Sequence, residues 1–147
     1  MKRTKCAIAR NGYKTHLTLN GYKIHWGDLT GKTIKNSTIV IRNYGDIHPF
    51  KDGPEFHAES AYIVDCDKNF VYYWVRKSVF PKLKHLYLLS HPCEPAVLHR
   101  DFEHIYLSSG LYGYKHRWAD NLTNITSIER DDVMYEIASY VPEPMIE

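Results

Sequence analysis

Hydrophobic and polar positions alternate over short stretches of this chain, and the pattern is clearest between residues 80 and 109. The same eight-residue phrase occurs twice there, as Leu83-Lys-His-Leu-Tyr-Leu-Leu-Ser90 and as Phe102-Glu-His-Ile-Tyr-Leu-Ser-Ser109. The second copy begins 19 residues after the first, and His, Tyr, Leu and Ser keep their places. Alternating apolar positions predict a short strand with one buried face. Recurrence at about 20 residues is typical of stacked repeats.

Weaker versions of this pattern occur along the rest of the chain. Residues 15–20, 36–43 and 61–65 each predict a short strand, and residues 122–128 predict a degraded last copy. A unit with one buried strand face cannot fold alone, so we expect neighbouring units to stack in parallel around a continuous core. The central residues expected to face that core are Leu17, Ile39, Tyr62, Leu86, Ile105 and Ile125.

The segments between these strands are less regular. Residues 21–35 contain Gly27 and Gly31 and predict an irregular return segment, and residues 46–59 predict a long loop. Other segments predict helices or a loose end: a short helix over 69–77, a closing helix over 129–140 and a frayed tail over 142–147.

The repeated phrases resemble the leucine-rich repeat signature, including its usual unit length. The resemblance is carried by residues 80–109, and the asparagine that usually closes the repeat's turn occurs only as Asn20 and Asn43. Weaker matches lie at 15–20, 36–43, 58–66 and 122–128. The resemblance implies an α/β fold, with short parallel strands in an irregular leucine-rich-repeat-like stack and a C-terminal helix, in one domain over residues 1–147. The alternative is an ordinary α/β sandwich with a parallel sheet.

Such a stack would place the side chains between the buried positions in columns on the open face of the sheet. Stacked Tyr and His side chains are suitable interface anchors because aromatic groups contribute a large contact area at small entropic cost. The alternative is that these pairs only stabilise adjacent strands. The predicted binding residues are Tyr87, Tyr106, His85, His104, Arg42 and Asp65. They suggest a non-catalytic module that binds another protein and needs no cofactor.

Composition and charge limit the class of protein, the kind of partner and the compartment that fit this chain. With 44% hydrophobic and 24% charged residues, the 147-residue chain has the composition of a folded domain. A formal charge of +2 is too small to argue for nucleic acid, so that partner is disfavoured. The basic N-terminus has too short an apolar run for a signal peptide, and no stretch is long enough to span a membrane. Three well-separated cysteines predict reduced thiols and a cytoplasmic protein.

Catalytic and metal chemistry are the other possibilities. A small α/β hydrolase could use Cys93 with His91 or His99 and with Asp101 as the orienting group, although no nucleophile elbow is present. The sequence also contains neither a Walker loop nor a Rossmann fingerprint. A metal is not expected, because the spacings of zinc modules are absent from the cluster His85, His91, Cys93, His99 and His104. An uncapped sheet edge could also pair with a second copy into a homodimer.

Overall fold

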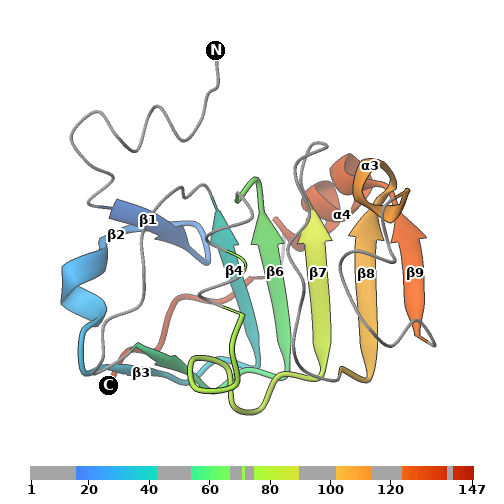
Figure 1. Cartoon of the computed structure of the whole chain (residues 1–147). Helices are drawn as coiled ribbons and strands as arrows, with labels where there is room; N and C mark the ends of the chain where they lie inside the picture. Colours follow the sequence, from blue (N-terminus) through green and yellow to red (C-terminus); the bar gives the residue numbers. More distant parts are fainter. Residues whose placement is uncertain are drawn as a thin grey trace.

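A seven-stranded sheet dominates the computed structural model (Figure 1), with strand order β2-β1-β4-β6-β7-β8-β9. The structure describes residues 16–42, 54–66, 71, 75–89, 102–113, 124–138 and 141–147. The sheet strands are β1 (His16–Leu19), β2 (Tyr22–His25), β4 (Thr38–Arg42), β6 (Ser60–Val64), β7 (His85–Leu89), β8 (His104–Ser108) and β9 (Ile125–Ile128). The helix α4 (Arg130–Ile137) follows β9. The expected α/β class, with short parallel strands and a C-terminal helix, is confirmed.

Strands β4, β6, β7, β8 and β9 pair in parallel and follow one another in chain order across the sheet. The two copies of the repeated phrase lie side by side as β7 and β8. Their register places His85 opposite His104 and Tyr87 opposite Tyr106. Because side chains alternate between the two faces, a slip of one residue would turn every buried side chain outward, so the apolar positions fix this register.

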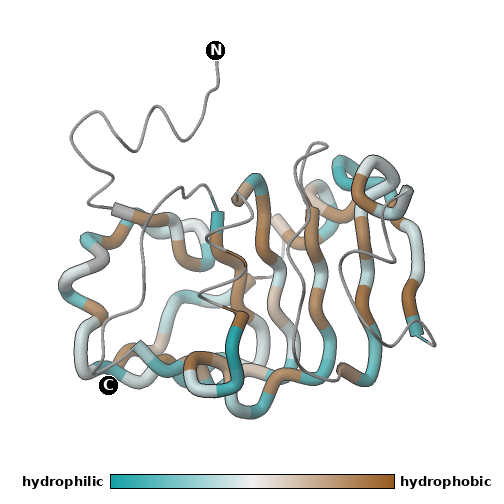
Figure 2. The backbone as a smooth tube through the Cα atoms, viewed as in Figure 1, coloured by the Kyte–Doolittle hydropathy of each residue, from teal (hydrophilic) through white to brown (hydrophobic). Residues whose placement is uncertain are grey.

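One face of the parallel strands is the main core of the protein. Figure 2 shows hydrophobic segments recurring along β4, β6, β7 and β8. Two rows of apolar side chains cross these strands on this face: Ile39, Ala61, Leu86 and Ile105, then Ile41, Ile63, Leu88 and Leu107. The connecting segments pack against them, and Phe56 and Phe80 stack there with ring centroids 4.8 Å apart.

The prediction that Tyr62 is the core residue of β6 was wrong by one position. Ala61, not Tyr62, lies opposite Ile39 and Leu86, and Tyr62 points to the other face. Four consecutive apolar residues, Ala61 to Val64, leave no polar position that would fix the phase of the alternation in sequence. Neighbouring strands decide it instead, because the register places Ala61 in the inner row and Tyr62 on the opposite face, where its ring stacks on Tyr87.

The N-terminal strands differ from the expected parallel stack. Leu17 is buried in the main core, but β1 runs antiparallel to both β2 and β4. Asn20 and Gly21, with φ of 49° and 85°, form the two-residue turn between β1 and β2, and positive φ at both positions suits such a hairpin. The expected irregular segment 21–35 contains β2, the 3-10 helix η1 (Trp26–Leu29) and β3 (Thr33–Ile34). β3 pairs in parallel with β5 (Glu55–Phe56).

The C-terminal part crosses the sheet face opposite the main core. In Figure 1, α4 lies behind the sheet near the carboxyl ends of the strands, and the chain then runs back to β3. The closing helix expected over 129–140 is observed as α4, whereas the tail expected to fray is ordered. Lys35 N donates to Met145 O at 2.9 Å. The sequence of the tail does not reveal that β3 offers it an edge. A second short helix, α3 (Ser109–Tyr112), follows β8. Most of the helix expected over 69–77 lies outside the described residues.

Candidate binding face

The second face of the sheet carries three rows of side chains, set by the register of the parallel strands. The histidine row lies nearest the amino ends and contains Thr38, Ser60, His85 and His104. The tyrosine row contains Val40, Tyr62, Tyr87, Tyr106 and Thr126. The carboxyl-end row contains Arg42, Val64, Leu89, Ser108 and Ile128. Polar and aromatic groups therefore occupy the amino-terminal part of this face.

Helix α4 covers the carboxyl-end row. Ile137 is buried against Val64 and Leu89, and Val40 and Tyr62 complete this second apolar cluster. The face expected to be open is therefore partly covered, because its apolar residues need a partner element. The part that is only half-buried contains four of the predicted binding residues, His85, Tyr87, His104 and Tyr106, here called the aromatic patch; Tyr87 also packs against the second apolar cluster.

A charged clamp fixes α4 to the sheet. Arg130 Nε donates to Asp65 Oδ1 at 3.0 Å, and Arg130 Nη2 donates to Asp65 Oδ2 at 2.5 Å. Arg42 Nη2 lies 3.8 Å from the same Asp65 oxygen. Two of the predicted binding residues, Arg42 and Asp65, thus belong to the attachment of α4. The structure separates them by role from the aromatic patch.

The clamp also affects proton binding at Arg130. The hydrogen bond to Asp65 raises the pKa of the Arg130 guanidinium above its ordinary value, while burial opposes the shift. A cation whose pKa is raised by folding makes its full contribution to stability at any pH below its unfolded-state pKa. That contribution is lost only as the pH rises through the folded-state pKa. The clamp therefore keeps its positive charge throughout the neutral range.

The tyrosine row forms a continuous stack. Tyr62 and Tyr87 stack with ring centroids 4.1 Å apart, and Tyr87 and Tyr106 stack at the same distance with an interplanar angle of 5°. His104 stacks on Tyr106 at 4.3 Å, and its Nε2 lies 2.5 Å from Thr126 Oγ1. The stack and this hydrogen bond restrict the side-chain rotamers. They present rigid, half-exposed aromatic groups beside the covered part of the face.

A pair that sequence reasoning missed lies near the amino ends of the strands. His57 Nε2 is 2.5 Å from Glu55 Oε1. His57 also lines an open hollow together with Lys35, Asn36, Ser37, Glu59 and Lys82. No hydrogen bond joins the described residues Ser37 and His57. The available signal was a Glu and a His two residues apart, at the start of β5 and just after its end.

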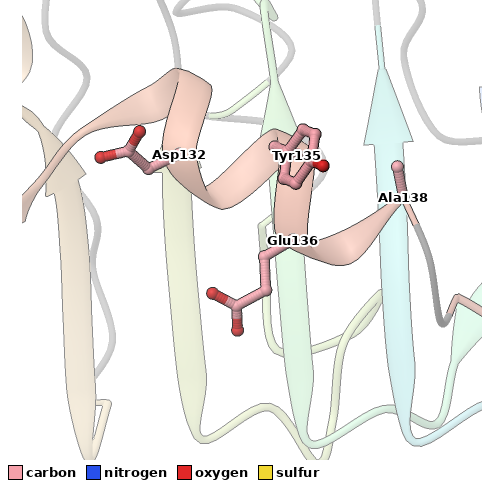
Figure 3. A pocket seen from close by; sticks show the side chains of 4 residues that line it. All are labelled: Asp132, Tyr135, Glu136 and Ala138. Carbon is pink, nitrogen blue, oxygen red and sulfur yellow. The ribbon is translucent and has the colours of Figure 1, made fainter.

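The outer surface of α4 borders a second hollow (Figure 3), lined by Asp132, Tyr135, Glu136 and Ala138. The Tyr135 side chain is 86% exposed. Figure 3 shows Glu136 directed along the sheet toward the amino ends of the strands. The hollow is open, and it contains no arrangement of catalytic groups among the described residues.

The remaining predicted chemistry falls largely outside the described part of the chain. Cys93, His91, His99 and Asp101 lie there, so the hydrolase arrangement stays a prediction. Within the described ranges, no group of three or more His, Cys, Asp and Glu side chains could hold a metal ion. No helix in those ranges is both long enough and apolar enough to cross a bilayer.

Comparison with known proteins places the chain among viral relatives. Uncharacterized protein R849 of Acanthamoeba polyphaga mimivirus is 44% identical over 133 residues, covering 90% of this chain and 94% of the relative. Uncharacterized protein L163 of the same virus is 34% identical over 127 residues, covering 86% and 93%. No solved structure matches. These findings name no repeat class, so the leucine-rich-repeat resemblance stays a prediction. The model of a family of unknown function, DUF5845, matches residues 39–119, and the chain belongs to this family.

Proposed function

We propose that the protein is a non-catalytic interaction module that docks another protein on the aromatic patch. The observation that carries this proposal is the change of side-chain type along the second face. Where α4 covers the face, the side chains are mainly apolar; beside it, His and Tyr residues stay half exposed. Amphipathic aromatic groups suit a surface that is solvated in the free protein and desolvated in a complex.

The stacking of the patch favours binding as well as stability. Ordering flexible side chains opposes association by about 0.5–1.5 kcal/mol for each group immobilised. Tyr87 and Tyr106 are already ordered by their 4.1 Å stack, so this cost falls mostly on folding. Stacking occupies the ring faces and leaves the ring edge and hydroxyl group of Tyr106 as contact points. Such groups fit a protein segment that offers backbone carbonyls or planar side chains as hydrogen-bond partners.

The partner can be identified by crosslinking from the patch itself. A photo-crosslinking amino acid replaces Tyr106 in the full chain, expressed in cells that naturally make it. The same substitution at Tyr22, a half-exposed tyrosine on the far strand β2, is the matched control. A protein captured only from position 106 is then purified for direct binding measurements.

The decisive test uses that purified pair. We expect the double variant Tyr87→Ala, Tyr106→Ala to bind at least about tenfold more weakly, since interface tyrosines often contribute more than about 1 kcal/mol each. Tyr22→Ala should bind like the unsubstituted chain. Equal affinity of the double variant, with its fold intact by circular dichroism, would show that the patch is not the docking surface.

A further inference from the structure

The C-terminal tail is held in the manner of a bound peptide. Residues 142–147 run antiparallel beside β3, with Ile146 opposite Ile34. Thr33 N donates to Glu147 O at 3.0 Å, and Glu147 N donates to Thr33 O at 2.8 Å. These are the contacts of an added strand on a sheet edge, a common mode of peptide recognition.

Two buried asparagines complete the groove. Asn36, 3% exposed, donates from Nδ2 to Glu143 O at 3.1 Å and accepts at Oδ1 from Met145 N at 2.9 Å. Asn20 Nδ2 donates to Pro142 O at 3.1 Å. Removing the tail would take away both of these hydrogen bonds from the Asn36 amide. The groove formed by the β3 edge, Asn20 and Asn36 therefore requires an extended backbone.

The tail itself contributes little to the core. The Met145 side chain is 57% exposed and the Ile146 side chain is 39% exposed. The Glu147 carboxylate contacts Lys35 Nζ at 3.1 Å, but both groups are about half exposed, and such a surface pair is weak. Segments held mainly by backbone hydrogen bonds open more readily than core strands. Because these hydrogen bonds are made to backbone groups of the tail, the same segment of another molecule can form them equally well.

We propose that this groove accepts the C-terminal segment of a second copy of the chain in place of its own, producing a tail-exchanged dimer. Exchange of an identical element is a low-cost route to dimers, since every contact within the groove is preserved. Helix α4 stays on its own sheet through the Arg130–Asp65 clamp and Ile137. Val141 also packs against the cluster that contains Ile137, so the exchange involves only residues 142–147.

Two complementary full-length variants test the proposal. Met145→Pro removes the N–H that binds Asn36 and so disables the tail while its groove is intact. Asn36→Ala disables the groove while its tail is intact. We expect the two variants to associate when mixed, as a concentration-dependent rise in fluorescence anisotropy of one labelled copy. Neither variant should associate with itself.

The mixing experiment is interpreted only after both variants show cooperative unfolding, which establishes that they are folded. Absence of association in the mixture up to about 1 mM, the order of effective concentrations for short linkers, would overturn the proposal. Association of Met145→Pro with itself would also overturn it, because the contact would not involve the tail. If Asn36→Ala fails to fold, a labelled peptide of residues 141–147 replaces it. That peptide should bind Met145→Pro at least about tenfold more tightly than the unsubstituted chain, whose own tail competes; no binding to Met145→Pro would overturn the proposal.

Discussion

The two faces of the parallel sheet are built by different means. On the inner face, connecting segments after several strands supply apolar groups, so Ile63, Leu86 and Leu88 are enclosed from all sides. On the outer face, the described cover is one C-terminal segment, α4 and the following Val141, placed by one apolar cluster and the Arg130–Asp65 clamp. A core made by many segments resists local change, whereas a face covered by one helix can leave part of itself free for binding.

The largest expected effect lies on the inner face. Leu88→Ala should lower the free energy of unfolding by about 3 kcal/mol, within the usual range of 2–5 kcal/mol for buried leucines. Leu89 is equally buried but faces α4, so Leu89→Ala should be milder because the helix can move to fill the space. Urea unfolding of both variants measures the difference. A greater loss from Leu89→Ala would break the distinction between the two faces.

The clamp should give the next largest effect. Arg130→Ala removes two hydrogen bonds from the partly buried Asp65 carboxylate, and charged hydrogen bonds contribute about 1.5–3 kcal/mol. We expect a loss of about 2 kcal/mol and faster hydrogen exchange in α4 than in β7. Asp131→Ala is the control, because its carboxylate also contacts Arg130 but is 91% exposed. Unchanged exchange in α4 would mean that the clamp does not hold the helix.

A smaller effect is expected in the aromatic patch. Tyr106→Ala removes the ring that stacks on both Tyr87 and His104, and aromatic pairs contribute about 0.5–1.5 kcal/mol beyond area burial. Because Tyr106 is half exposed, thermal unfolding should show a modest loss of about 1 kcal/mol. Tyr106→Phe keeps the ring and should be close to neutral. A loss as large as that of Leu88→Ala would mark the patch as core and weaken its assignment to binding.

The smallest effect is expected at the outer surface of α4. Tyr135 is 86% exposed, and substitutions at such positions usually stay within about 0.5 kcal/mol. Tyr135→Ala should therefore leave the denaturation midpoint nearly unchanged. A clear destabilisation would show that α4 is covered on both sides and that the outer face is more closed than its exposure indicates.

Much of the parallel sheet could be predicted because the pattern is local. The phrases at 83–90 and 102–109 carry apolar residues at alternating positions, and they pair as β7 and β8 with their histidines and tyrosines in register. The assignment of residues to the two faces was wrong at Tyr62, because the run of apolar residues there shows no alternation.

The candidate site residues also differed in how well the sequence could place them. His85, Tyr87, His104 and Tyr106 share one face by strand parity, whereas Asp65 has a φ of 54° just beyond β6 and follows no such rule.

The sequence by itself determined the strands β1, β4, β6, β7, β8 and β9 and the closing helix, because the period of apolar side chains is a property of neighbouring residues; β2, β3 and β5 lie in segments expected to be irregular or a loop. Only the tertiary structure decided that β1 is antiparallel, that α4 covers part of the outer face and that the tail returns to β3. These features depend on backbone edges and buried amides such as Asn36, whose partners lie more than 100 residues away. No local pattern records such pairings, since the groups that need each other meet only after the sheet has formed.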